Sequence, residues 1–206
     1  MSWEPSFRLQ DARVTSAESA FEGYFRVDRL WIRHATFAGD SIEICREVFR
    51  RGNAVCVLLY DPIADAVVLV EQFRVGALSD RPGAPSPWML EVVAGIVEPG
   101  ESAEDVARRE AVEEAGLRLS DVRPITRFLP SGGGCDEWID LMYAEVDSSL
   151  AGGVHGLADE GEDIKVHVLS ASEAFELVVS GKINSSPAII GLQWLELNRS
   201  RLYRGS

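Results

Sequence analysis

The residues best suited to catalysis lie between Gly95 and Leu117, in a segment that reads G-x5-E-x7-R-E-x-x-E-E-x-G-L. Side chains three and four positions apart share one face of a helix, so Glu110, Glu113 and Glu114 are expected to project together. Neighbouring carboxylates repel one another, and a divalent cation that prefers hard oxygen ligands, such as Mg²⁺ or Mn²⁺, would relieve that repulsion. A bare R-E-x-x-E-E run more often forms a solvated acidic face, so the spacing of the whole segment has to decide between these interpretations.

The acidic run is predicted to occupy a helix over residues 102–115. Ser102 is a suitable N-cap, and Gly116 follows the last helical residue. Glu101 comes from the loop just before this helix. Arg109 is expected to pair with one of the helix carboxylates and to hold it in place.

The pattern of the remaining chain predicts a mixed sheet with helices on its faces, an α/β (α+β) architecture. Short apolar runs rich in β-branched residues, separated by turn residues such as Asp61-Pro62, indicate strands of a buried sheet. The predicted strands are residues 24–32, 41–49, 54–60, 66–71, 88–93, 125–129, 138–146 and 164–169, and the predicted loops are 77–87, 131–134 and 148–163.

Two predicted helices close the chain. The first begins with a capping box formed by Ser170 and Glu173. The second begins at Ser186, with Pro187 at its first helical position. One face of this last helix is expected to pack on the sheet through its apolar residues Ile190, Trp194 and Leu197.

The composition is that of a globular protein. The chain has 206 residues, of which 46% are hydrophobic and 26% charged, and its net charge is −13. Such a charge disfavours nucleic acid and anionic membranes as partners. The three cysteines form no C-x-x-C pair, which argues against a disulfide framework and favours a cytoplasmic location. The N-terminus does not resemble a signal peptide, and the apolar runs are too short to span a bilayer.

Residues 1–50 are expected to form a small N-terminal β subdomain, and residues 51–206 the main domain. Six of the eighteen arginines fall between Arg26 and Arg51. They form either a solvated edge or an anion-binding face, because the planar guanidinium suits bidentate phosphate contacts. The sequence leaves both alternatives open.

The full spacing from Gly95 to Leu117 matches the Nudix signature at every fixed position, and on this resemblance the chain is identified as a Nudix hydrolase. The runs Glu71-Gln72-Phe73-Arg74, Pro87–Gly95 and Gly156–Asp163 resemble the bacterial ADP-ribose pyrophosphatase branch of that family. The resemblance, which spans about residues 23–197, implies a Nudix fold with a mixed sheet sandwiched between helices. It also implies Mg²⁺-dependent hydrolysis of ADP-ribose to AMP and ribose 5-phosphate, by a homodimer that exchanges N-terminal subdomains and shares its active sites.

The resemblance further implies roles for individual residues. The implied metal ligands are Glu110, Glu114, Glu162 and the backbone carbonyl of Ala94. The implied catalytic carboxylates are Glu113 and Glu160, with Glu160 as the general base. Glu101 and Arg109 are implied to support these residues. The implied substrate contacts are Tyr24, Phe25, Arg46, Glu47, Arg51, Arg74, Ile96, Ser131, Gly132, Gly133 and Glu137.

Pyrophosphate chemistry accounts for these residue types. The negative charge of a pyrophosphate repels an attacking hydroxide, and bound metal ions screen that charge and lower the pKa of water. A carboxylate within reach then takes the proton. Glu160 lies in the acidic run Asp159–Asp163, where neighbouring charge favours proton uptake. The alternative for this run is an ordinary acidic surface loop.

The aromatic pair Tyr24 and Phe25 suits stacking on a purine, or packing at a subunit interface, and both interpretations can hold together. The three histidines, His34, His155 and His167, have no metal-like spacing and are expected to be structural or exposed.

One departure from the branch concerns the substrate. Gly132 stands where a proline is usual, and Pro130 lies two residues earlier. GDP-mannose or another nucleotide sugar is therefore an alternative substrate. A non-catalytic nucleotide-sensing module with the same fold is disfavoured because all four carboxylates of the signature are kept.

Overall fold

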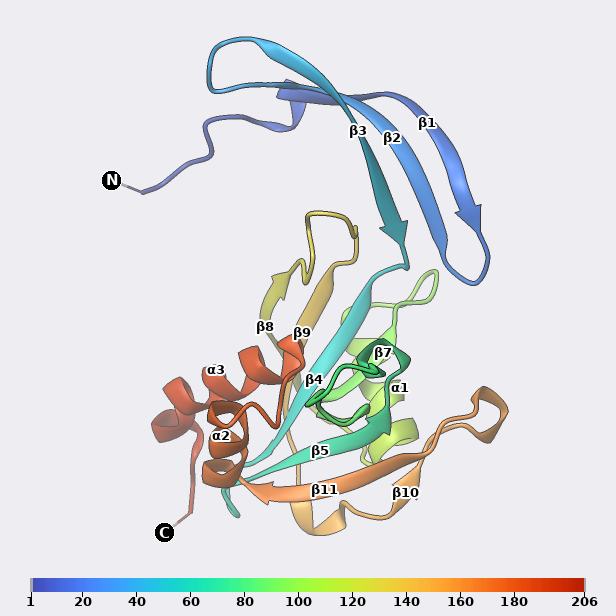
Figure 1. The fold of residues 1–206 in the computed structure, drawn as a ribbon. Coiled ribbons are helices and arrows are strands. Elements are labelled where there is room, and N and C mark those ends of the chain that lie inside the picture. The colour runs from blue at the N-terminus through green and yellow to red at the C-terminus, as the bar shows by residue number, and fades with distance from the viewer. Residues whose placement is uncertain (1, 206) are drawn as a thin grey trace. The chain divides into compact units, whose positions relative to one another are not determined.

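The computed structural model describes residues 2–205, apart from the side chain of Glu160. Two compact units are present (Figure 1): residues up to Gly52 together with Leu129–Glu137, and Asn53–Phe128 together with the chain from Trp138 onward. The segment Leu129–Glu137 joins the first unit through backbone pairing with Phe49, whose N–H donates to the carbonyl of Gly134 at 2.8 Å.

Strands dominate the first half of the chain, and the longest helices lie in the second half. In chain order the elements are η1 (Leu9–Asp11), β1 (Ala12–Glu22), β2 (Arg26–Ala35), β3 (Ser41–Arg50), β4 (Ala54–Asp61), β5 (Ala66–Phe73), η2 (Val75–Ala77), β6 (Trp88–Glu91), β7 (Val93–Ile96), α1 (Ala103–Ala115), β8 (Val122–Phe128), β9 (Ile139–Glu145), η3 (Ser148–Leu150), β10 (Val154–His155), η4 (Ala158–Glu160), β11 (Ile164–Ser170), α2 (Ala171–Val179) and α3 (Ser186–Leu202).

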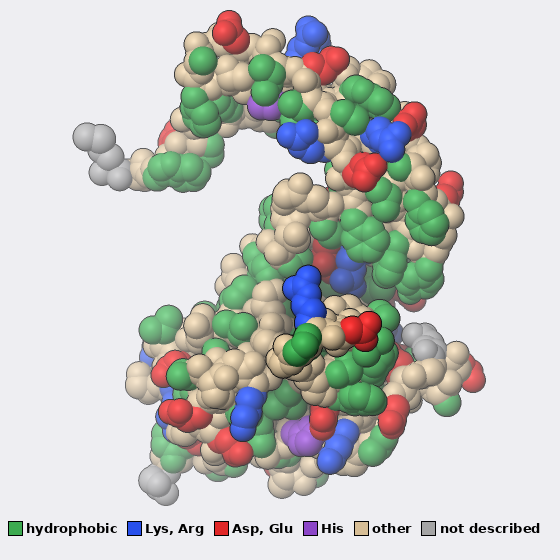
Figure 2. All heavy atoms as spheres, in the orientation of Figure 1, with side chains coloured by type: hydrophobic (Ala, Val, Ile, Leu, Met, Phe, Trp, Pro, Cys, Tyr) green, Lys and Arg blue, Asp and Glu red, His purple; other side chains and the backbone are tan. Residues whose placement is uncertain are grey.

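The first unit is an antiparallel sheet in the order β1-β2-β3. The sequence predicted β2 and β3 and missed β1. Every residue of β1 is exposed, so this strand lacks the alternation of apolar and polar residues that a half-buried strand shows. Apolar side chains therefore lie on the surface of this unit (Figure 2), among them Val14, Phe21, Tyr24, Phe37 and Ile42.

Many arginines of the first unit pair with carboxylates of the same sheet. Arg29 binds Glu18 at 2.7 Å and Glu47 at 3.1 Å across neighbouring strands. Asp28 accepts from both Arg26 and Arg50. These pairs support the solvated-edge interpretation for the arginines that form them.

The second unit is built on a mixed sheet in the order β10-β11-β5-β4-β9-β8, with β6 and β7 pairing with β5 and β4. Strands β4 and β9 run parallel, whereas the other pairs are antiparallel. The predicted run 88–93 is divided between β6 and β7, which separate at Val92. The mixed sheet expected from the sequence is confirmed.

Helices cover both faces of this sheet. Along β4, Val55, Val57 and Leu59 belong to the core under α1, whereas Cys56 and Leu58 belong to the core under α2 and α3. Successive side chains of a strand point to opposite faces, so a fully apolar strand such as β4 serves both layers. The predicted sandwich of a sheet between helices is confirmed.

The predicted packing face of α3 is wrong at Leu197, which is 84% exposed. Ile190 and Trp194 are half-buried at the edge of the contact, and Leu192 and Leu195 are fully buried. Gly191 is buried beside these leucines and faces Leu58 and Leu141 of the sheet.

The caps agree with the sequence. Ser102 Oγ accepts from the backbone of Asp105 at 3.2 Å, and Gly116 adopts φ 69°, the left-handed conformation that favours glycine. Ser170 Oγ accepts from the backbone of Glu173 at 3.2 Å. Pro187 occupies the second position of α3 rather than the first, since the helix begins at Ser186. Among the described residues, no helix is long and apolar enough to cross a membrane.

Candidate active site

Helix α1 presents the predicted carboxylates to the strand β7. Glu114 belongs to the buried face of the helix and is 2% exposed. The side chain of Glu110 is 13% exposed and that of Glu113 is 28% exposed. The three therefore project from neighbouring positions of one helix, at increasing distance from the core.

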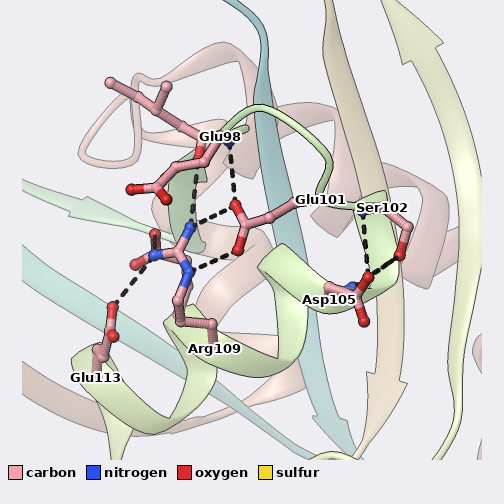
Figure 3. A network of polar contacts seen from close by, with 8 residues as sticks. Glu98, Glu101, Ser102, Asp105, Arg109 and Glu113 are labelled. Atoms are coloured by element: carbon pink, nitrogen blue, oxygen red, sulfur yellow. Dashed lines mark hydrogen bonds and ion pairs between the residues drawn. The ribbon is translucent and has the colours of Figure 1, made fainter.

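Arg109 connects the carboxylates on the outer side of α1 (Figure 3). Its Nε and Nη2 atoms donate to the two oxygens of Glu101 at 3.0 and 3.1 Å. Its Nη1 atom donates to Glu110 Oε1 at 2.6 Å and to Glu113 Oε2 at 3.3 Å. One guanidinium therefore binds the glutamate of the loop, Glu101, and two glutamates of the helix, Glu110 and Glu113.

The strand β7 contacts the carboxylates through its backbone. The N–H of Ala94 donates to Glu114 Oε2 at 3.1 Å. At Gly95 a Cβ atom would lie 1.7 Å from Glu110 Oε1, so the carboxylate of Glu110 occupies the space that any other residue type would fill. The carbonyl of Ile96 accepts from Arg109 Nη2 at 3.3 Å. Ala94 and Ile96 therefore contact α1 through their backbones; the metal-ligand role of the Ala94 carbonyl and the substrate contact of Ile96 stay predictions.

Burial and crowding shift the carboxylates away from their ordinary acidity. Burial raises the pKa of Glu114 to about 8. The hydrogen bond from Ala94 lowers this pKa, and the negative charge of Glu110 raises it further. Burial raises the pKa of Glu110 to about 7, although Arg109 lowers it, and the charges of Glu113 and Glu162 add to the rise. Glu101 has its pKa lowered by the hydrogen bonds from Arg109. Two buried carboxylates with raised pKa values favour binding of a compensating positive charge.

The late acidic loop lies against the C-terminal half of α1. The N–H of Gly156 donates to the carbonyl of Glu113 at 3.1 Å. The carboxylate of Glu162 accepts from the backbone of Leu157 at 3.0 Å, within the loop, and its charge acts on Glu110. The side chain of Glu160, the predicted general base, lies outside the described part of the chain.

The donor chemistry of this region suits a hard divalent cation. Glu110 and Glu114 supply oxygen ligands only, and both lie where α1 meets the backbone of β7. In the described chain, no three His, Cys, Asp or Glu side chains already converge as a ligand group. Arg109 binds Glu110, and Glu162 accepts from the backbone of its own loop.

The predicted substrate contacts divide between the two units. Nine of them, Tyr24, Phe25, Arg46, Glu47, Arg51, Ser131, Gly132, Gly133 and Glu137, belong to the first unit, and Arg74 and Ile96 belong to the second.

Within the first unit, the structure brings Phe25, Arg51 and Glu137 together. Tyr24 packs edge-on against Phe25 with ring centroids 4.7 Å apart. The guanidinium of Arg51 lies 5.9 Å from the ring of Phe25, and its Nε atom is 3.3 Å from Glu137 Oε1. Phe49, which the sequence did not single out, completes the group by packing 5.0 Å from Phe25. An aromatic face beside a guanidinium suits a base and a phosphate.

The other predicted contacts of the first unit are held by local bonds. Arg46 donates to the carbonyl of Cys45 at 2.8 Å, and Glu47 pairs with Arg29. The carbonyl of Ser131 accepts from the backbone of Cys135 at 3.0 Å, closing the turn that contains Gly132 and Gly133. Among the described residues, none of the side-chain hydrogen bonds or ion pairs joins these five residues to Tyr24, Phe25 or Phe49.

In the second unit, Arg74 pairs with Glu91 at 2.7 Å. Glu91 was not predicted, although it stands in the Pro87–Gly95 run. A second unpredicted residue is the buried Gln72, whose Nε2 atom donates to Glu114 Oε1 at 3.4 Å. A signal for Gln72 existed in the sequence, because it follows the apolar run of β5 where another apolar residue would be expected.

The histidines contact neighbouring residues of the fold. His167 Nε2 lies 2.7 Å from Glu71 Oε2, His155 Nε2 lies 2.8 Å from the carbonyl of Gly152, and His34 Nδ1 lies 2.8 Å from the carbonyl of Ala35.

Comparisons with known proteins agree with the site. The NUDIX domain matches residues 50–189. ADP-ribose pyrophosphatase of Escherichia coli strain K12 is 46% identical over 198 residues, covering 96% of this chain and 93% of that protein. The Haemophilus influenzae ADP-ribose pyrophosphatase is 44% identical, covering 98% and 94%.

More distant matches include a GDP-mannose pyrophosphatase of Escherichia coli, 33% identical over 86% of this chain and 91% of that protein. A solved crystal structure of an ADP compounds hydrolase aligns with a TM-score of 0.71 over 95% of this chain and 98% of that chain. At 19% identity this likeness concerns the fold alone. With the matched domain, the sequence identity and the carboxylates of α1 all in agreement, the chain belongs to the NUDIX family.

Proposed function

We propose that this protein hydrolyses the pyrophosphate bond of ADP-ribose to AMP and ribose 5-phosphate, with Mg²⁺ or Mn²⁺ as the cofactor. The observation that carries the proposal is the 46% identity to an ADP-ribose pyrophosphatase over 96% of this chain. The convergence of Glu110 and Glu114 on the backbone of β7 supports the metal dependence.

Each of these residues is proposed to have its own role in the hydrolysis. Glu110, Glu114, Glu162 and the carbonyl of Ala94 would hold the cation, and Arg109 would keep Glu110 and Glu113 in place. A bound divalent cation neutralises pyrophosphate charge and lowers the pKa of water. Glu160 is proposed as the general base that takes the proton of the attacking water, with Glu113 as a further catalytic carboxylate.

Substrate selection is proposed to lie outside the signature segment. Phe25, which packs edge-on with Tyr24 and Phe49 and lies close to Arg51, supports recognition of a base and a phosphate in the first unit. Arg74 is proposed as a phosphate contact of the second unit, with Arg46, Glu47, Ile96, Ser131, Gly132, Gly133 and Glu137 as further contacts.

GDP-mannose hydrolysis is a second candidate, and the 33% identity to a GDP-mannose pyrophosphatase favours it.

A homodimer with shared active sites is proposed as the working form, supported by the exposed apolar side chains of the first unit. A cytoplasmic location is proposed from the reduced cysteines expected for this composition.

A side-by-side assay of ADP-ribose, ADP-mannose, GDP-mannose, NADH and diadenosine polyphosphates tests the substrate. Each is incubated with the protein and Mg²⁺ or Mn²⁺, and the products are separated by chromatography. The proposal requires AMP and ribose 5-phosphate from ADP-ribose at the highest kcat/KM of the panel. Clear cleavage of another member with none of ADP-ribose would reject it.

A further inference from the structure

Two polar side chains meet inside the otherwise apolar layer between β5 and α1. On β5, Val68 and Val70 belong to the core under α1, and Gln72 continues their row two residues further along, 6% exposed. On α1, Glu114 stands in the buried row that includes Ala111. An apolar residue at position 72 would continue both patterns, so the amide is a departure that requires an explanation.

The carboxylate of Glu114 is held from two strands at once. Gln72 Nε2 donates to its Oε1 atom at 3.4 Å, and the backbone N–H of Ala94 donates to its Oε2 atom at 3.1 Å. A carboxylate offers about four lone-pair positions, so two donors leave further positions for a cation. The two bonds fix how the carboxylate is rotated about its side chain.

Stability alone does not account for this pair. Replacing both partners of a buried hydrogen bond by apolar groups of the same shape is often nearly neutral for stability. Fixed outer partners are, in contrast, the usual means by which a metal ligand is oriented. The sheet supplies such a partner to Glu114 on each of its oxygens.

We propose that Gln72 is a positioning residue, which orients the Glu114 carboxylate for binding of a divalent cation. Gln72 touches neither the cation nor the substrate in this role. The inference rests on the metal-dependent hydrolysis proposed above, and it assigns a function to a residue outside the signature segment.

The test is a titration with Mn²⁺ alone, in the absence of substrate. Wild type and Gln72→Met are freed of cations with a chelator, and the Kd for Mn²⁺ is measured by isothermal titration calorimetry. Methionine keeps the length of glutamine and removes the amide donor. Gln193→Met, at an exposed position of α3, is the matched control. Thermal unfolding of all three cation-free proteins reports on the fold.

The expected result is a Kd for Mn²⁺ raised about tenfold or more in Gln72→Met, with no change in Gln193→Met. The unfolding temperature of Gln72→Met should fall by several degrees, because Glu114 Oε1 loses a donor, and its unfolding should stay cooperative. Cleavage of ADP-ribose by Gln72→Met should then recover as the Mn²⁺ concentration is raised, because the ligands themselves are intact. If Gln72→Met does not fold, Gln72→Asn, which withdraws the amide by one methylene, is expected to weaken Mn²⁺ binding in the same way.

An unchanged Kd in the folded variant overturns the inference, and so does a wild-type protein that binds no Mn²⁺. Equal weakening in Gln193→Met also overturns it, since the effect would then not depend on Glu114. A wild type that binds Mn²⁺ and leaves ADP-ribose intact rejects the proposed substrate while the role of Gln72 stands, so the two failures are distinguishable.

Discussion

The Oε1 atom of Glu110 lies 1.7 Å from the place that a Cβ atom on residue 95 would occupy. Gly95 and Glu110 are fifteen positions apart in the chain, on β7 and α1, and their contact joins the two elements of the candidate site. The signature therefore begins with glycine for a packing reason: the strand must leave room for a carboxylate.

Gly95→Ala is expected to displace the Glu110 carboxylate and to lower kcat/KM about 100-fold, since misplacement by about 1 Å has effects of that size. The free energy of unfolding should fall by about 1–3 kcal/mol, because the new Cβ overlaps Cγ, Cδ and Oε1 of Glu110 and the whole side chain must move. Gly76→Ala is the control, as a Cβ there meets nothing within 4 Å. Full activity in Gly95→Ala would contradict the assigned geometry.

Arg109→Lys tests the bidentate contact with Glu101. A lysine ammonium cannot reproduce the two parallel N–H bonds and also reach Glu110, so kcat/KM is expected to fall about 10-fold to 100-fold. The neighbouring Arg108 is the matched control, since its guanidinium donates to two backbone carbonyls, those of Glu104 at 3.4 Å and Ser120 at 2.9 Å. Steady-state kinetics should show Arg108→Lys within about twofold of wild type. Equal losses in both variants would assign the effect to the helix rather than to the site.

Removal of divalent cations is expected to abolish hydrolysis and to preserve the fold. The apolar layers on the two faces of the sheet hold the second unit together without a metal. Circular dichroism after treatment with a chelator should be unchanged, and added Mg²⁺ or Mn²⁺ should restore activity. A cation that binds only the native state stabilises it by about 2.7 kcal/mol at a concentration of 100 times its Kd, so the unfolding temperature should rise with the cation. Loss of secondary structure on chelation would contradict this prediction.

The carboxylate of Asp61 is expected to stabilise the folded state at neutral pH and to lose this effect in acid. Burial raises the pKa of this carboxyl, but bonds from the backbones of Ala64, Ser148 and Ile63 outweigh burial and leave the pKa below its ordinary value of 3.8. A carboxyl with a depressed pKa in the folded state stabilises the fold above pH 3.8 and stops doing so as the pH falls through its folded pKa.

Asp61→Asn should therefore cost about 2 kcal/mol of unfolding free energy at pH 7, and the difference from wild type should shrink as the pH falls below 3.8. Urea denaturation over this pH range measures it. Asp121→Asn is the control, because Asp121 forms an exposed pair with Arg123. If the difference in unfolding free energy between Asp61→Asn and wild type does not change with pH, the bonds to Asp61 stabilise its protonated form as well, and the prediction fails.

Leu195 and Leu197 form a matched pair on α3. Leu195 is fully buried and Leu197 is 84% exposed. Leu195→Ala is expected to cost about 3 kcal/mol of unfolding free energy, and Leu197→Ala about 0.5 kcal/mol or less. Chemical denaturation of both variants decides the packing face of the helix. Similar costs at the two positions would restore the face expected from the sequence.

The sequence by itself determined the elements with strong local signals. The signature spacing, the Ser102 cap and the Gly116 terminus predicted α1 and the carboxylates that it presents. The buried strands β4 and β5 were predicted because apolar runs rich in β-branched residues and bounded by turns are typical of buried strands. The exposed strand β1 was missed, since its residues carry no pattern of burial.

Only the tertiary structure decided which residues meet across elements. The contact of Gly95 with Glu110, the bond from Gln72 to Glu114 and the packing of Gly191 on Leu58 each join positions far apart in the chain. Local patterns record which face of an element is apolar, whereas the close approach of two elements depends on the size of both partners. For that reason the sequence identified the chemistry of α1, and the packing of β5 and β7 against it decided how its carboxylates are held.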